Sequence, residues 1–206
     1  MNGICVVTSK AGAYYAIVSR LRKAGLPFVS ILAESDFKDC AVVLTTSAEA
    51  GRFGGKVAVL EELDDDPGVF KGQILSRLVG ASDTLLIGVD PGSRTGMAAY
   101  YGEATLAFHT FAASPALCSM VGAFVGKVPA RKSVVRIGNG NPAHAARLAE
   151  SIRREAPAAT IELVDESGTT SRSARMRGVQ GDQRAAARIA FRKGEVVSPG
   201  NPRTRA

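Results

Sequence analysis

The sequence contains no tryptophan, few aromatic residues and no long hydrophobic run. Aromatic residues make up only 6% of the chain, and every apolar run is far shorter than the roughly 20 residues that cross a bilayer. The N-terminus also lacks the pattern of a signal peptide. Hydrophobic residues account for 46% and charged residues for 22%, which is typical of a globular protein. We therefore expect a cytoplasmic protein without a membrane partner.

Cysteine is scarce as well. Cys5, Cys40 and Cys118 are odd in number and widely separated, with no CxxC motif and no cysteine–histidine pair. This pattern predicts neither a disulfide framework nor a zinc site. It favours an intracellular, reducing compartment.

The common nucleotide-binding motifs are missing too. The stretch "TSKAGAY" (8–14) has the look of a strand-to-helix turn, but it fits neither GxGxxG nor GxxxxGK[ST]. The acidic stretch "EELDDD" (61–66) could hold a metal, although consecutive carboxylates in a turn are usually solvated. We interpret both stretches as structural and assign no chemistry to the first part of the chain.

Positive charge is abundant, and it is unevenly distributed. Residues 1–83 hold 9 Lys/Arg and 10 Asp/Glu, whereas residues 84–206 hold 17 and 9, a net charge of +8. Clustered Lys and Arg bind phosphate backbones through counterion release. A nucleic acid is therefore the expected partner, and a solvated basic surface is the alternative.

The chain divides into two α/β domains in this interpretation. Residues 1–83 alternate short apolar strands with amphipathic helices, which predicts a small parallel α/β domain of unknown role. Residues 84–195 begin with three strands (84–90, 96–102 and 104–111) and continue with alternating helices and strands. That order predicts a mixed sheet, an antiparallel meander followed by βα units. Residues 196–206 form a flexible basic tail in this prediction.

Three carboxylates stand at the ends of predicted elements in the second domain. Asp90 ends the apolar strand "LLIGVD" and precedes a Pro-Gly turn, Asp165 and Glu166 follow the strand 160–164, and Asp182 begins a helix. Each could be an ordinary turn or cap residue. Residues 172–193 nevertheless carry seven cations around the single acid Asp182. Acids at the ends of separate elements are what two-metal hydrolysis of a phosphodiester requires.

The motifs resemble a known family. "IGVDPGSRTG" is similar to the first strand and turn of the RuvC-like branch of the RNase H-like nucleases. "LVDESGTT" resembles a segment of its YqgF-type members, and "GDQRAAARIAFRKG" resembles their closing helix. The three segments also occur in the family's order, over residues 84–194.

This resemblance implies an RNase H-like domain, a Holliday-junction-resolvase-like activity and catalytic, metal-binding roles for Asp90, Glu166 and Asp182. It implies two Mg²⁺ or Mn²⁺ ions as cofactors and structured or branched DNA or RNA as the substrate, and it leaves a homodimer open. The expected nucleic-acid-binding residues are basic: Arg94, Arg172, Arg175, Arg177, Arg184 and Arg188.

The sequence departs from the family pattern at three positions, and two alternatives stay open. Junction resolvases carry a glutamate where this chain has Gly138 and Asn139, Val179 stands three residues before Asp182 in place of an acid or histidine, and Ser167 replaces an arginine. One alternative is a catalytically silent nucleic-acid-binding protein with the nuclease fold. The other is a phosphate-loop ATPase of the actin and sugar-kinase type, which requires a second, duplicated domain.

Overall fold

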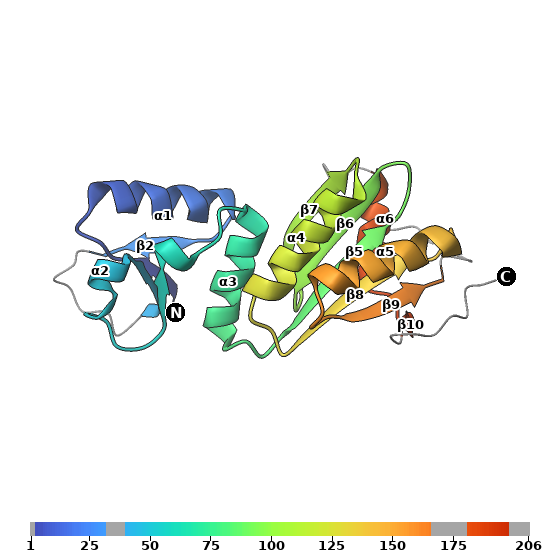
Figure 1. Cartoon of the computed structure of the whole chain (residues 1–206). Helices are drawn as coiled ribbons and strands as arrows, with labels where there is room; N and C mark the ends of the chain where they lie inside the picture. Colours follow the sequence, from blue (N-terminus) through green and yellow to red (C-terminus); the bar gives the residue numbers. More distant parts are fainter. Residues whose placement is uncertain (1–2, 32–39, 166–180, 198–206) are drawn as a thin grey trace. The chain divides into compact units, whose positions relative to one another are not determined.

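The structure is a computed structural model that describes residues 3–31, 40–165 and 181–197 (Figure 1). The chain forms two compact units, Met1–Ser82 and Asp83–Ala206. The first contains a sheet of four parallel strands and the second a mixed sheet of six strands. The predicted fold class, a small parallel α/β domain followed by a mixed sheet with a meander and βα units, is therefore confirmed.

The first unit is built on a parallel sheet with the strand order β2-β1-β3-β4. In β1, Ile4 and Val6 face a core that α1 and α3 cover, whereas Cys5 and the residue after the strand, Val7, face a smaller apolar cluster on the other side. The elements of this unit are β1 (Gly3–Val6), α1 (Ala11–Lys23), β2 (Phe28–Ser30), β3 (Cys40–Thr45), α2 (Ser47–Ala50), β4 (Val57–Val59), the 3₁₀ helix η1 (Leu60–Glu62) and α3 (Pro67–Val79).

A disulfide in this unit corrects the expectation from the cysteine pattern. Cys5 and Cys40 are joined, with their Cα atoms 5.8 Å apart, and Cys118 is a buried free thiol. The two cysteines are 35 residues apart in sequence, but β1 and β3 are neighbouring strands whose register shifts between Gly3 and Ile4. Their separation along the chain therefore hid their proximity, and the cysteine argument for a reducing compartment no longer holds.

The second unit is a three-layer arrangement around the sheet β10-β9-β8-β5-β6-β7. The strands β5, β6 and β7 form an antiparallel meander, and β5, β8 and β9 are parallel. Figure 1 shows α4 and α5 on one face of this sheet and α6 on the other. The elements are β5 (Thr84–Asp90), β6 (Thr95–Tyr101), β7 (Ala104–Phe111), α4 (Ser114–Lys127), β8 (Lys132–Gly138), α5 (Pro142–Glu155), β9 (Thr160–Val164), α6 (Gly181–Ala190) and β10 (Glu195–Val196).

The central position of β5 explains its apolar sequence. Leu85, Ile87 and Val89 are fully buried on the side that α4 and α5 cover. Leu86 packs on the other side against the alanine-rich face of α6. A strand covered on both faces is apolar along its whole length instead of alternating.

The end of the chain differs in detail from the sequence prediction. Glu195 and Val196 form the short antiparallel strand β10 beside β9, and the Val197 N–H donates to the Ile161 carbonyl at 2.9 Å. The chain therefore stays attached to the sheet beyond residue 196, where the predicted tail begins, and residues 198–206 lie outside the described part. Among the described helices, none is both long and apolar enough to cross a membrane.

Candidate active site

Asp90 lies at the carboxyl end of β5, on the face of the sheet that α6 covers. Gly88, two residues earlier on the same face, makes a close approach of α6 possible. A Cβ atom at Gly88 would lie 2.0 Å from the Ala186 carbonyl oxygen and 2.6 Å from the Ala190 nitrogen. The helix backbone therefore rests directly on β5. Because side chains alternate along a strand, Asp90 points to the same side as this contact.

Asp182, in the first turn of α6, lies next to Asp90. Gly96 of β6 is the cross-strand partner of Asp90, and paired residues project to the same face. A Cβ atom at Gly96 would lie 2.2 Å from the Asp182 carbonyl oxygen and 3.1 Å from the Asp182 Cβ. The structure therefore brings Asp90 and Asp182 together, and Gly96 provides the space that Asp182 occupies.

Thr110 extends this row of residues and was not singled out from the sequence. It pairs with Gly96 across the β6–β7 ladder, so it lies on the same face. Its Oγ1 is buried and has no hydrogen-bond partner among the described residues. Buried hydroxyls are nearly always hydrogen-bonded in folded proteins, so this oxygen marks a polar position where a ligand or water is expected. Only the strand register reveals it, because Thr110 is distant from both acids in sequence.

The end of β8 contributes no carboxylate to this row. Gly138 ends that strand, and the β5–β8 register places Ile137 beside Val89. The following residue, Asn139, donates its backbone N–H to the Val164 carbonyl at 2.9 Å, and its side-chain Oδ1 is buried without a hydrogen-bond partner among the described residues. An amide oxygen thus lies near the position where junction resolvases carry a glutamate.

An internal ion pair fixes the other end of α6. Arg136 of β8 donates from Nε to Glu162 Oε2 of β9 at 2.8 Å and from Nη1 to the Ala190 carbonyl at 2.6 Å. Glu162 Oε2 also accepts from the Gly194 N–H at 3.3 Å. A cation at a helix C-terminus is favourable because it neutralises the exposed carbonyl groups. This pair, which we call the α6 clasp, fixes how α6 lies along the sheet and hence where Asp182 stands.

The remaining predicted site residues are divided between the surface and the undescribed segment. Glu166, Arg172, Arg175 and Arg177 lie outside the described residues. Asp165 is exposed, and its backbone carbonyl accepts from Arg192 Nη1 at 3.0 Å. Exposed side chains are also found at three arginines, one in the turn after β5 and two on α6: Arg94, Arg184 and Arg188.

The donor set at this end of the sheet suits a hard divalent cation. Asp90 and Asp182 would supply carboxylate oxygens, which Mg²⁺ and Mn²⁺ prefer, and Glu166 would have to supply the third. Within the described ranges, no three His, Cys, Asp or Glu side chains gather into a metal-binding group.

The first unit contains a second carboxylate-centred arrangement, and its partners are structural. Glu49, 7% exposed, accepts from Thr8 Oγ1 at 2.6 Å, from the Ser9 N–H at 2.8 Å and from Thr46 Oγ1 at 2.8 Å. Burial raises the pKa of Glu49, but these hydrogen bonds outweigh it and lower the pKa to about 2. The "TSKAGAY" turn therefore binds a carboxylate of the protein itself.

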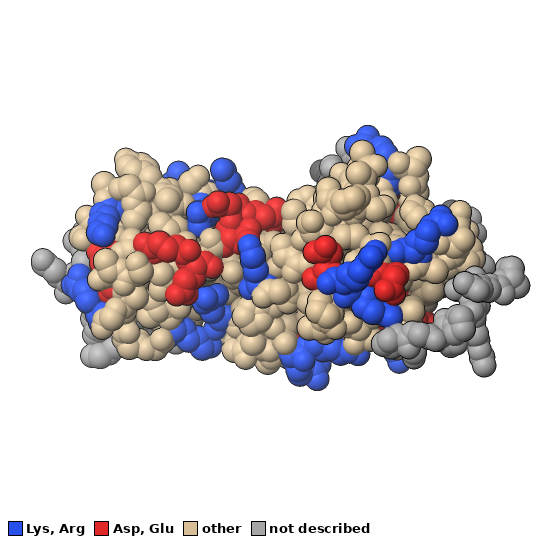
Figure 2. Space-filling model, in the orientation of Figure 1, with Lys and Arg blue, Asp and Glu red and all other residues tan. Residues whose placement is uncertain are grey.

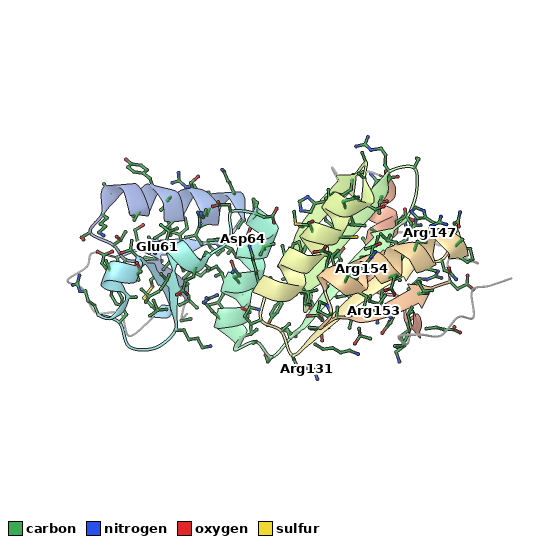
Figure 3. The ribbon with its side chains drawn as sticks, viewed as in Figure 1. Glu61, Asp64, Arg131, Arg147, Arg153 and Arg154 are labelled. Carbon is green, nitrogen blue, oxygen red and sulfur yellow. A yellow bond between two sulfur atoms is a disulfide. The ribbon has the colours of Figure 1, made fainter. Side chains whose placement is uncertain are left out.

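The acidic stretch 61–66 also has internal partners. The Glu61 and Asp64 side chains are labelled in Figure 3. Glu61 accepts the Ser47 N–H at 3.0 Å and Asp64 accepts the Asp66 N–H at 2.9 Å, while Asp65 pairs with Arg20. Asp66 caps α3 by accepting from the Gly68 and Val69 N–H groups. These carboxylates therefore bind backbone N–H groups and Arg20 within the first unit.

The α4–α5 side of the second unit has mixed charge. Arg147, Arg153 and Arg154 project from α5, and Arg131 from the loop before β8 (Figure 3). Figure 2 shows acidic side chains between the basic ones on this face. Arg153 also donates to the Val197 carbonyl at 2.8 Å. This surface is therefore less suited to a polyanion than a continuous basic patch would be.

Comparisons with known proteins identify no family. No protein-family model matches the chain, and the search of curated proteins finds no significant match.

Proposed function

We propose that the second unit is a metal-dependent nuclease that hydrolyses phosphodiester bonds of structured nucleic acid, branched DNA or RNA. Three kinds of observation support the proposal: the motifs that resemble RuvC-like nucleases, the charge of +8 on residues 84–206, and the meeting of two predicted metal ligands. The strand order β9-β8-β5-β6-β7 with an antiparallel β5-β6-β7 meander is compatible with an RNase H-like topology.

The single observation that carries the proposal is the contact between Asp182 and Gly96. Asp90 and Asp182 are 92 residues apart in the chain, and a structural acid at either position would not need the other. Yet α6 begins directly over the cross-strand partner of Asp90. Carboxylates on neighbouring elements are the ligands that a divalent cation prefers. A metal site accounts for this arrangement.

In the proposed mechanism Asp90, Glu166 and Asp182 hold the cofactor. Two Mg²⁺ or Mn²⁺ ions bound there would activate water and stabilise the leaving oxygen. Arg94 in the turn after β5 and the α6 residues Arg184 and Arg188 are exposed. They would bind phosphates, which guanidinium groups do through paired hydrogen bonds. The same role is proposed for Arg172, Arg175 and Arg177.

A cleavage assay tests the proposal. Labelled single-stranded, duplex, four-way-junction and structured-RNA substrates are incubated with Mg²⁺ or Mn²⁺, and at least one should be cut. Asp90→Asn and Asp182→Asn should each abolish cleavage, and the double variant should be no worse than either, because ligands of one metal cluster act as a unit. Glu103→Gln, an exposed carboxylate in the β6–β7 turn, is the matched control and should cut normally. Cleavage that survives Asp90→Asn would refute the mechanism.

A catalytically silent nucleic-acid-binding protein is the second candidate. Gly138 at the end of β8 favours it, because a ligand of the junction resolvases is missing there. This candidate predicts that nucleic acid is bound but not cut, and that Asp90→Asn does not change the binding of Mg²⁺. The ATPase alternative has less support, because the strands described in the first unit are all parallel and do not repeat the β5–β7 meander.

A further inference from the structure

The outward side of α6 carries a row of two arginines and an aromatic ring. Arg184 and Arg188 are exposed, and Phe191, in the turn that follows the helix, is 59% exposed. The four-residue spacing places Arg184 and Arg188 on one side of α6, and Phe191 follows three residues later, just beyond the end of the helix. The buried residues Ala186, Ala187 and Ala190 form the opposite side, which packs on the sheet. Arg184 is two residues from Asp182, so the two side chains project from different sides of the helix: Asp182 towards the sheet and Arg184 towards solvent.

Phe191 is held in place although it is exposed. Its ring packs edge-to-face on Tyr100, with centroids 4.7 Å apart, and Tyr100 is only 4% exposed. Tyr100 in turn contacts Phe108 at 6.2 Å. Aromatic pairs of this geometry stabilise each other beyond the area they bury. The sheet therefore supports a fixed aromatic surface that faces solvent.

The basic residues near Phe191 favour a ligand that is both flat and negatively charged. Arg188 and Lys193 are exposed on either side of Phe191 in the sequence. An apolar protein partner or a lipid surface would favour a wider apolar patch. Among the described residues of α6 and the turn after it, Phe191 is the one large exposed apolar side chain, and its exposed sequence neighbours are basic. A flat apolar group attached to anions matches it, and a nucleotide is such a ligand because every base has a π-face. The four-residue step from Arg188 to Arg184 rises about 6 Å, comparable to the separation of successive phosphates on one strand.

We propose that Phe191 stacks an unpaired nucleobase while Arg188 and Arg184 bind the phosphates that follow it along the outward side of α6. The substrate of the proposed nuclease would then carry unpaired nucleotides a few positions from the bond that is cut. A fully paired duplex cannot offer such a base without unstacking it. The place of this base relative to the bond that is cut rests on the proposed function, but the stacking itself does not.

Binding of oligonucleotides that contain 2-aminopurine tests the stacking. The assay uses the full chain carrying Asp90→Asn, in EDTA, so that cleavage plays no part. Phe191→Ala should weaken single-strand binding about 5- to 150-fold and remove the quenching of 2-aminopurine, with the salt slope unchanged. Phe191→Tyr should restore both, and Phe191→Leu should not. Blunt duplex binding should be the same in all variants.

Arg184 and Arg188 are tested by the salt slope. Replacing both by Gln should reduce the slope for a single strand by about 1.4, because each phosphate contact contributes about 0.7. Undiminished single-strand affinity in Phe191→Ala would overturn the proposal, and so would an equal loss for blunt duplex. A Phe191→Ala variant that turns a dimer into a monomer would assign the ring to a second copy of the chain. If quenching of 2-aminopurine depends on Phe191 but the parent protein cuts no substrate, the proposed nuclease activity is refuted and the stacking proposal still holds.

Discussion

Two glycines determine how closely α6 approaches the sheet. At Gly88 and Gly96, a Cβ atom would overlap helix backbone at 2.0 and 2.2 Å, and backbone cannot rotate away as a flexible side chain can. The position of Asp182 beside Asp90 therefore depends on the absence of two side chains. The candidate site therefore requires glycine at these two positions as well as the two acids.

Gly96→Ala is expected to displace the start of α6. Overpacking of this kind costs about 1–3 kcal/mol and more where the neighbours cannot move, so the urea midpoint of the second unit should fall. Metal-dependent cleavage should fall further than the stability loss explains, because Asp182 moves away from Asp90. Gly126→Ala in α4 is the control, since its Cβ would meet nothing within 4 Å. Equal stability of the Gly96 and Gly126 variants would contradict the close contact.

Glu49 makes the first unit sensitive to acid. Its pKa is lowered to about 2 in the folded chain, against an ordinary value of 4.5. Because the folded pKa is the lower one, this carboxylate contributes stability above pH 4.5 and loses that contribution as the pH falls towards 2. Glu49→Gln should lower stability at pH 7 by about 1–3 kcal/mol, since Thr8, Ser9 and Thr46 lose a charged acceptor.

Urea unfolding between pH 7 and pH 2 measures this effect. The difference between the parent protein and Glu49→Gln should be largest at neutral pH and should shrink below pH 4.5. Glu62→Gln, an exposed carboxylate of the same unit, serves as the control and should show no such trend. A difference that is constant with pH would mean that the charge of Glu49 does not stabilise the fold.

At the scale of elements, α6 is held by a close backbone contact at its N-terminal end and by a hydrogen bond from an arginine at its C-terminal end. Its first turn rests on Gly96, and its last carbonyl accepts from Arg136 of the α6 clasp. The clasp is nearly buried, with side-chain exposures of 15% for Arg136 and 10% for Glu162. A buried pair contributes little net stability compared with apolar residues, but a single member left alone is costly.

A double-mutant cycle on the α6 clasp checks this view. Arg136→Met should destabilise the second unit by about 3–5 kcal/mol, because Glu162 is left as a buried, unpaired charge. Adding Glu162→Leu should recover a large part of that loss. Cleavage by the double variant should stay impaired even where stability returns, because nothing then fixes the C-terminal end of α6. Full activity in the double variant would show that Gly88 and Gly96 alone position the helix.

The elements themselves could be predicted from the sequence, but their contacts could not. The meander of β5, β6 and β7 follows from three strands without a helix between them, and the parallel first sheet follows from strands alternating with helices. The two-residue strand β10 has no pattern of its own and exists only through β9. Thr110 and the Cys5–Cys40 bond depend on register, and the sequence does not show register.

At the scale of the whole molecule, the charge and the candidate site are in the same unit. Residues 84–206 hold the excess of +8, and residues 1–83 are close to neutral. Each unit has its own apolar core: Ile17, Leu21 and Phe70 are buried in the first, and Ile87, Leu117 and Phe124 in the second. Compact units with separate cores generally fold on their own. The affinity for nucleic acid should therefore belong to the second unit.

Dividing the chain between Ser82 and Asp83 tests this assignment. The 83–206 fragment should bind oligonucleotides with the salt slope of the full chain, because that slope counts the phosphates that are contacted and all expected contacts come from this unit. The 1–82 fragment should not bind at moderate salt, since its basic and acidic residues nearly balance. Circular dichroism establishes that both fragments are folded before binding is compared. A slope for the full chain that exceeds that of the 83–206 fragment would show that the first unit also contacts phosphates, with Lys10, Arg22 and Lys23 as the residues to neutralise next.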